Sequence, residues 1–163
     1  MPNHPTLRTI LPSDNAAIAR IIRSTLMEFG AAKPGTVYYD EATDRLSEIF
    51  SIPGSVYYIA EEDGIILGGA GIYPTDGLSS DTCEVVKMYL LPAARGKGLG
   101  AILMARCIDF ARAYGYRQIY LETMPELADA IKLYAKTGFR RLPAPMGQSG
   151  HFGCGVWMMK EIG

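Results

Sequence analysis

Apolar positions follow a helical spacing in the first part of this chain and a strand-like spacing further on. Near the N-terminus they recur every three or four residues, which predicts a helix that ends at about Glu28. These apolar residues are Ile18, Ile21, Ile22 and Leu26. Ser13 is expected to cap this helix, and Asp40 a second, shorter helix that ends before Pro53.

From Val56 onward the pattern changes to short apolar runs rich in β-branched and aromatic residues, which predict strands. The turn Glu62-Asp63-Gly64 joins two of these runs into an expected antiparallel hairpin. The predicted strands cover residues 6–11, 56–60, 65–73, 83–91, 118–123, 139–142 and 156–160. Two further helices are predicted over residues 101–114 and 126–136, each followed by a glycine.

This order of elements predicts a mixed α/β fold rather than a regular alternation of strands and helices. Helices come early, a hairpin follows, and one strand–helix–strand unit comes next. No repeat or long linker divides the 163 residues, so we expect a single domain over 1–163.

Composition narrows the class of protein. A hydrophobic content of 48% is enough for a core and excludes disorder. A net charge of −1 argues against a nucleic-acid binder that works by bulk electrostatics. The three cysteines, Cys83, Cys107 and Cys154, are widely spaced and are expected to be reduced. With no signal-peptide pattern and no apolar run of membrane-spanning length, we expect a cytoplasmic protein that does not bind membranes.

The segment Arg95–Gly100, Arg-Gly-Lys-Gly-Leu-Gly, is the strongest chemical signal in the chain. It lies between a predicted strand and a predicted helix, where bare backbone amides and the helix dipole bind phosphate groups. Gly96–Ala101 also fits the dinucleotide pattern G-x-G-x-x-A, with Glu122 as a possible ribose contact. Against that alternative, Pro92–Arg95 separates the strand from the first glycine, and too little chain follows for a doubly wound sheet.

The same loop resembles the Arg/Gln-x-x-Gly-x-Gly/Ala signature of the GNAT superfamily of acyl-CoA-dependent N-acyltransferases. Arg95, Gly98 and Gly100 occupy its fixed positions. The segment Ala130–Phe139 is similar to a second motif of that superfamily, a helix ending in Tyr-x-x-x-Gly-Phe. The resemblance implies a mixed, mostly antiparallel sheet of about seven strands flanked by about four helices.

It also implies that acetyl-CoA is the acyl donor. The pyrophosphate is then expected on the loop amides, and the pantetheine arm beside the preceding strand at a local bulge that exposes an amide to the thioester carbonyl. The implied cofactor-binding residues are Met88, Tyr89, Leu90, Arg95, Gly96, Lys97, Gly98, Leu99 and Gly100.

For catalysis, the resemblance implies that Tyr134 protonates the leaving thiolate, and two carboxylates compete for the role of base. Glu84 stands early on the strand before the loop, and Glu122 ends the following strand. Many members carry asparagine where Leu127 stands here, so that cofactor contact is not expected.

The glycine-rich loop at residues 147–155 precedes the last predicted strand and carries His151 and Cys154. It is interpreted either as a wall of the acceptor pocket or as a plain flexible loop. A nucleophilic pair of Cys154 and His151 is a further alternative. No metal site is expected, because the histidines have no ligand spacing.

These observations predict an N-acetyltransferase that moves an acetyl group from acetyl-CoA directly to a primary amine of a small molecule, an amino acid or a peptide. The alternative from another class is a non-catalytic acyl-CoA sensor or interaction module on the same fold. A homodimer is possible by family resemblance.

Overall fold

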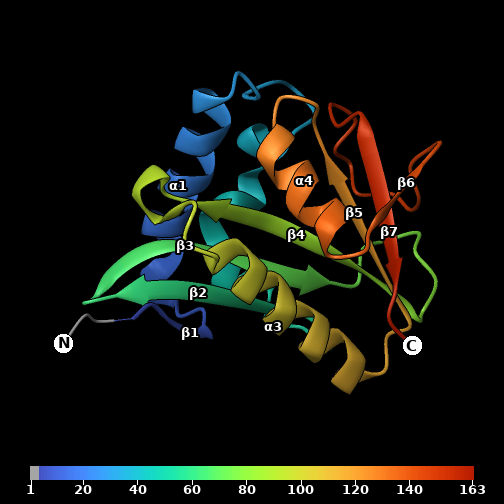
Figure 1. The fold of residues 1–163 in the computed structure, drawn as a ribbon, viewed down its shortest axis with the longest axis horizontal. Helices are drawn as coiled ribbons and strands as arrows, with labels where there is room; N and C mark the ends of the chain where they lie inside the picture. The colour runs from blue at the N-terminus through green and yellow to red at the C-terminus, as the bar shows by residue number, and fades with distance from the viewer. Residues whose placement is uncertain (1–3) are drawn as a thin grey trace.

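Seven strands form a single sheet in the order β1-β2-β3-β4-β5-β7-β6 in the computed structural model, which describes residues 4–163 (Figure 1). The strands are β1 Thr6–Thr9, β2 Val56–Glu62, β3 Ile65–Tyr73, β4 Thr82–Leu90, β5 Gln118–Thr123, β6 Arg140–Leu142 and β7 Val156–Glu161. Neighbouring strands are antiparallel except β4 and β5, which are parallel. The predicted mixed, mostly antiparallel sheet is thus confirmed.

Four α-helices pack on the two faces of this sheet, as predicted. They are α1 Asn15–Glu28, α2 Leu46–Ile49, α3 Leu99–Tyr114 and α4 Ala128–Lys136. In Figure 1, α3 and α4 lie in front of the strands and α1 lies behind them. Each face therefore has its own apolar core, one beneath α3 and α4 and one beneath α1 and α2.

The helical spacing in α1 produces its packing. Its four periodic residues, Ile18, Ile21, Ile22 and Leu26, are all buried against the sheet. Full burial of an aliphatic side chain of this size contributes about 2 kcal/mol, so this face fixes α1 on the sheet.

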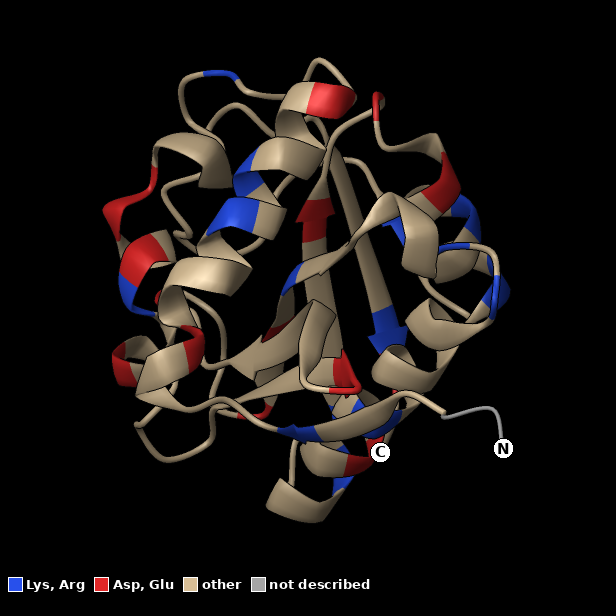
Figure 2. Cartoon of the chain, turned by 90° about the vertical axis from the view of Figure 1, so that its left-hand side faces the viewer, with Lys and Arg blue, Asp and Glu red and all other residues tan. Residues whose placement is uncertain are grey.

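None of the helices in the described residues is long and apolar enough to cross a membrane. Figure 2 shows lysine and arginine interspersed with aspartate and glutamate over the side that it presents.

The start of the first helix differs from the prediction. A 3-10 turn over Pro12–Asp14 precedes α1, and no side-chain cap bond forms at Ser13. Asp14 instead bonds back across the 3-10 turn, because its Oδ2 accepts a hydrogen bond of 2.7 Å from the backbone N–H of Leu11. Asp40 has its predicted role, because its Oδ1 accepts from the Ala42 N–H at 3.0 Å.

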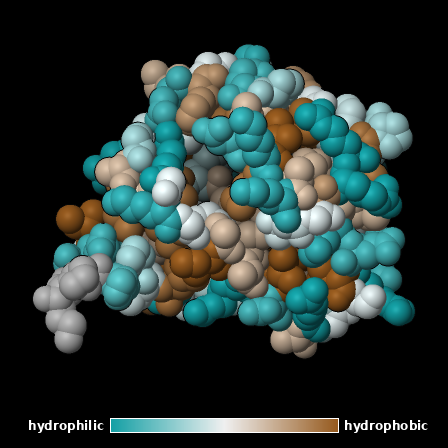
Figure 3. All heavy atoms as spheres, viewed as in Figure 1, coloured by the Kyte–Doolittle hydropathy of each residue, from teal (hydrophilic) through white to brown (hydrophobic). Residues whose placement is uncertain are grey.

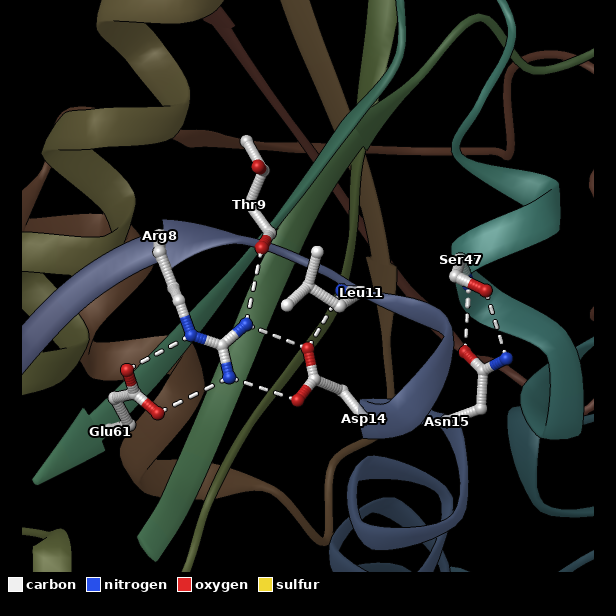
Figure 4. A network of polar contacts seen from close by, with 7 residues as sticks. All are labelled: Arg8, Thr9, Leu11, Asp14, Asn15, Ser47 and Glu61. Atoms are coloured by element: carbon white, nitrogen blue, oxygen red, sulfur yellow. Dashed lines mark hydrogen bonds and ion pairs between the residues drawn. The ribbon is translucent and has the colours of Figure 1, made fainter. Parts of the chain in front are cut away.

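Arg8 explains why Asp14 is preferred (Figure 4). The Arg8 guanidinium donates to both carboxylate oxygens of Asp14, at 2.7 and 2.9 Å, and to both oxygens of Glu61 on β2. The pKa of Asp14 is lowered chiefly by the hydrogen bonds from Arg8. This network ties the edge strand β1 to β2 and to the start of α1.

Asp14→Ala is expected to reduce the free energy of unfolding by about 2 kcal/mol, because it removes the hydrogen bond to the Leu11 N–H and leaves Arg8 with one acid partner. Denaturant unfolding at pH 7 measures this change. Asp44→Ala is the matched control, since it removes an equally bidentate ion pair with Arg23 that is much more exposed. Equal losses in the two variants would contradict the structural role of the Arg8 network.

Candidate active site

The site is a cavity formed where β4 and β5 separate. These parallel strands pair only over three positions, Thr82 to Glu84 with Gln118 to Tyr120. Beyond these paired positions lies a cavity of about 420 Å³, which is bounded by both strands, by the start of α3 and by one side of α4. The space-filling view in Figure 3 shows the surface hollowed near its centre, in the region between α1 and α4 of Figure 1.

Most of the predicted site residues meet at this cavity. Those that line it are Glu84, Met88, Tyr89, Leu90, Arg95, Gly96, Gly98, Leu99, Gly100, Glu122 and Tyr134. Lys97 is exposed and does not line it, so its side chain remains a solvent-facing charge at the cavity's edge.

The glycine loop opens α3 as expected. Gly98 is the N-cap in the left-handed conformation, with φ of 81°, and Gly96 has φ of 75°. A Cβ built on either glycine meets no heavy atom within 4 Å, so the backbone faces open space. The first amides of a helix have no acceptor within the helix, and the dipole makes this end positive, so the loop suits a diphosphate.

Arg95, one of the expected cofactor-binding residues, has its guanidinium engaged by the protein itself. Its guanidinium donates to both carboxylate oxygens of Glu28 at the end of α1, at 2.6 and 3.1 Å. Its Nε donates to the carbonyl of Leu90 at 3.0 Å, and its Cζ lies 5.1 Å from the ring centre of Phe29. Arg95 therefore clamps the loop onto β4 and α1.

The bulge implied by the resemblance is present in β4. Gly69 pairs with Tyr89 and Gly71 with Val86, so two β4 residues, at positions 87 and 88, face a single residue of β3. Lys87 adopts φ of 55°, and the buried Tyr57 hydroxyl donates to its carbonyl at 2.7 Å. Tyr57 thus holds the bulge in place, a role that the sequence did not indicate.

Glu84 is a buried carboxyl group on the pocket side of β4. Its side chain belongs to a residue that is only 3% exposed, and its Oε1 accepts a 2.6 Å hydrogen bond from the Thr75 hydroxyl. Burial raises the pKa of Glu84 to about 7, although the Thr75 hydrogen bond acts in the opposite direction. A carboxylate with a pKa near the working pH can both accept and release a proton.

Glu122 has a different environment at the end of β5. Its carboxylate accepts hydrogen bonds from the Tyr120 hydroxyl, at 2.7 Å, and from the Ser149 hydroxyl. Ser149 also accepts from the His151 N–H at 3.1 Å, which fixes the 147–155 loop beside the cavity. Of the two interpretations of that loop, its position supports a cavity wall, because both His151 and Cys154 line the cavity.

Tyr134 projects from α4 into the same cavity and is buried, with its ring against Phe139. Burial raises the pKa of its hydroxyl, so the proton is retained through the neutral range. The hydroxyl forms no hydrogen bond with another residue in 4–163, which leaves its proton available to a ligand. Leu127, where many relatives carry asparagine, lines the cavity as an apolar residue.

A nucleophilic pair of Cys154 and His151 is contradicted by the geometry. The His151 Nε2 lies 3.2 Å from Oδ2 of Asp40, and the contact between the cysteine and the histidine is a backbone hydrogen bond. Burial raises the pKa of the Cys154 thiol to about 12, whereas a reactive cysteine needs a lowered pKa. The residues in 4–163 contain no cluster of three or more side chains suited to a metal ion.

The dinucleotide interpretation of the glycine loop is also wrong. The 3-10 turn Pro92–Ala94 separates β4 from the loop, and the described sheet has a single parallel pair. A doubly wound fold requires the phosphate loop to leave a strand directly, within a parallel sheet.

Known proteins agree with this geometry. The sequence model of the acetyltransferase (GNAT) family matches residues 19–139. The uncharacterized N-acetyltransferase YjgM of Escherichia coli is 41% identical over 99% of this chain and 97% of its own length. The N-acetylaspartate synthetase of Rattus norvegicus is 33% identical over 61% of this chain and 31% of its own.

A solved structure extends the agreement to the ligand. The yncA protein of Salmonella typhimurium, solved with its cofactor acetyl-CoA, is 25% identical, with a TM-score of 0.76 over 98% of this chain and 95% of its own. The glycine loop and helix start described above fit the same cosubstrate. The chain is an acetyl-CoA-dependent N-acetyltransferase and belongs to the GNAT family.

Proposed function

We propose that this enzyme transfers the acetyl group directly from acetyl-CoA to a primary amine of a small molecule, an amino acid or a peptide, without a covalent enzyme intermediate. The observation that carries the proposal is that Glu84, Glu122 and Tyr134 line one cavity with the glycine loop. The relative named N-acetylaspartate synthetase supports an amino acid as one class of acceptor.

In this mechanism the loop amides from Gly96 to Gly100 hold the pyrophosphate, and the pantetheine arm runs beside Met88, Tyr89 and Leu90. Arg95 supports the loop through Glu28 rather than by moving to the phosphate. Beyond Glu84 the β4 backbone no longer pairs with β5, so its amides at the bulge are suited to polarise the thioester carbonyl.

Glu84 is the base in this proposal, because its pKa near 7 allows it to take a proton from the acceptor ammonium. The freed amine attacks the thioester carbonyl carbon and forms the C–N bond. The C–S bond then breaks, and the sulfur takes the proton of the Tyr134 hydroxyl. The nitrogen releases its surplus proton as the amide forms, and that proton restores the Tyr134 hydroxyl. Glu122, held by Tyr120 and Ser149, binds the ammonium before transfer.

Release of CoA thiol from acetyl-CoA, measured over a panel of amines and amino acids, tests this function. Tyr134→Phe is expected to lower kcat about 10²-fold with little change in the Kd for acetyl-CoA, because only the proton donor is lost. Tyr114→Phe on the exposed end of α3 is the matched control. Tight acetyl-CoA binding without thiol release on any amine would contradict the proposal.

A further inference from the structure

Lys87 has a mostly buried side chain whose ammonium the proposed acid–base chemistry does not use. The side chain is 7% exposed, and Lys87 lines the cavity. Its Nζ donates no hydrogen bond to any other residue in 4–163. No fully enclosed side-chain nitrogen or oxygen in 4–163 lacks a hydrogen-bond partner, so Nζ opens onto the cavity, where its protons can meet a ligand.

An unusual backbone conformation directs this side chain. Val85 packs on the α3 face of the sheet and Val86 on the α1 face, so regular alternation would place Lys87 on the α3 face. Instead, its left-handed φ of 55° at the bulge brings Nζ to within 3.9 Å of Asp40, in the segment that packs on α1. Strained backbone of this kind is concentrated at functional sites.

Asp40 does not satisfy the ammonium. The distance of 3.9 Å between Lys87 Nζ and Asp40 Oδ2 is too long for a hydrogen bond. Asp40 is already engaged, because Oδ1 accepts from the Ala42 N–H at 3.0 Å and Oδ2 contacts His151 Nε2 at 3.2 Å. These contacts lower the pKa of Asp40 to about 2, with the His151 hydrogen bond as the largest cause.

The charges in the cavity thus have opposite signs at different places. Glu84 and Glu122 are suited to an ammonium group, whereas Lys87 offers unused N–H donors to an anion. Burial lowers the pKa of Lys87, and a bound anion would favour its charged form. A molecule that carries an ammonium group and a nearby carboxylate matches both the acidic side chains and Lys87.

We propose that Lys87 binds the carboxylate of the acceptor, so that the enzyme selects free amino acids over amines without a carboxylate. This specificity rests on the proposed function. Asp40, oriented by His151, positions the lysine side chain beside the acceptor without itself contacting the substrate.

Thiol release tests the proposal with the full-length enzyme and acetyl-CoA. The acceptors are the common L-amino acids, each compared with its α-carboxamide; aspartate and glutamate are also compared with asparagine and glutamine. The best amino acid is expected to exceed its carboxamide in kcat/KM by about 10²-fold, as for a charge-assisted hydrogen bond. Lys87→Met should abolish this preference by lowering kcat/KM for the acid alone, mainly through KM.

Lys132→Met, an exposed lysine on α4, is the control and should leave the preference intact. Acetyl-CoA binding by Lys87→Met, measured by calorimetry, reports whether that variant is folded. Equal use of carboxamides and amino acids by the unmodified enzyme would overturn the proposal while leaving the acetyltransferase function in place. If no acceptor releases thiol, the proposed function fails, and calorimetry of amino acid against carboxamide in the presence of CoA decides separately whether Lys87 selects the carboxylate.

Discussion

Glu84→Gln is expected to lower kcat for amine acetylation about 10³-fold at pH 8 and to leave the Kd for acetyl-CoA nearly unchanged. Glutamine retains the shape of the side chain and an acceptor for the Thr75 hydroxyl, which lies 2.6 Å away, but it cannot take a proton. In the unmodified enzyme, kcat/KM should rise with pH and level off above about 7, because Glu84, the proposed base, must be ionised to accept a proton. That rise should be absent in Glu84→Gln.

The same substitution is expected to stabilise the fold at high pH. Burial raises the pKa of Glu84 from 4.5 to about 7, so the folded state favours the protonated form. The free energy of unfolding gains the full benefit of this preference below pH 4.5 and loses it as the pH rises to about 7. The total loss is about 3 kcal/mol. The midpoint temperature of thermal unfolding, Tm, should therefore be higher for Glu84→Gln than for the unmodified enzyme at pH 8, but not at pH 4.5.

Opposite effects on activity and stability distinguish a catalytic base from a structural carboxyl group. Glu48→Gln is the control, because Glu48 is exposed and lies outside the cavity. If Glu84→Gln keeps both its kcat and the rise with pH, and Glu122→Gln loses them, the base is Glu122 instead.

Local sequence signals predicted the elements and the loop because each depends on neighbours in the chain. Short apolar runs rich in β-branched and aromatic residues predicted the strands, and the glycines around Gly98 predicted the start of α3 to within two residues. The failure of Ser13 as the cap could not be predicted locally, because the start of α1 is held by Arg8, which bonds both Asp14 and Glu61 through tertiary contacts.

The polar cluster formed by Asp40, Lys87 and His151 could not be predicted from local sequence signals. Asp40, Lys87 and His151 come from three distant segments, and each pattern by itself resembles an ordinary cap, strand or loop residue. The bulge that joins them requires a left-handed lysine held by Tyr57, which no propensity favours. The proposed acceptor specificity therefore depends on long-range packing, whereas the proposed cofactor loop is a local motif.

Gly98→Glu is expected to weaken acetyl-CoA binding about 10³-fold, the second large effect. The added carboxylate would lie beside the amides that we propose hold the pyrophosphate, and juxtaposed like charges cost several kcal/mol. The left-handed φ of 81° at Gly98 also strains any other residue, so the amides would shift. Calorimetric titration with acetyl-CoA measures the loss.

Gly115→Glu separates the charge at the loop from the strain, because Gly115 caps the other end of α3 with φ of 111° and equally open space around it. Both variants should lose similar thermal stability, but only Gly98→Glu should lose acetyl-CoA binding. Binding within about threefold of the unmodified enzyme in both variants would mean that the start of α3 does not hold the pyrophosphate. Comparable losses in both would instead show that strain in α3, rather than charge at its N-terminus, controls the affinity.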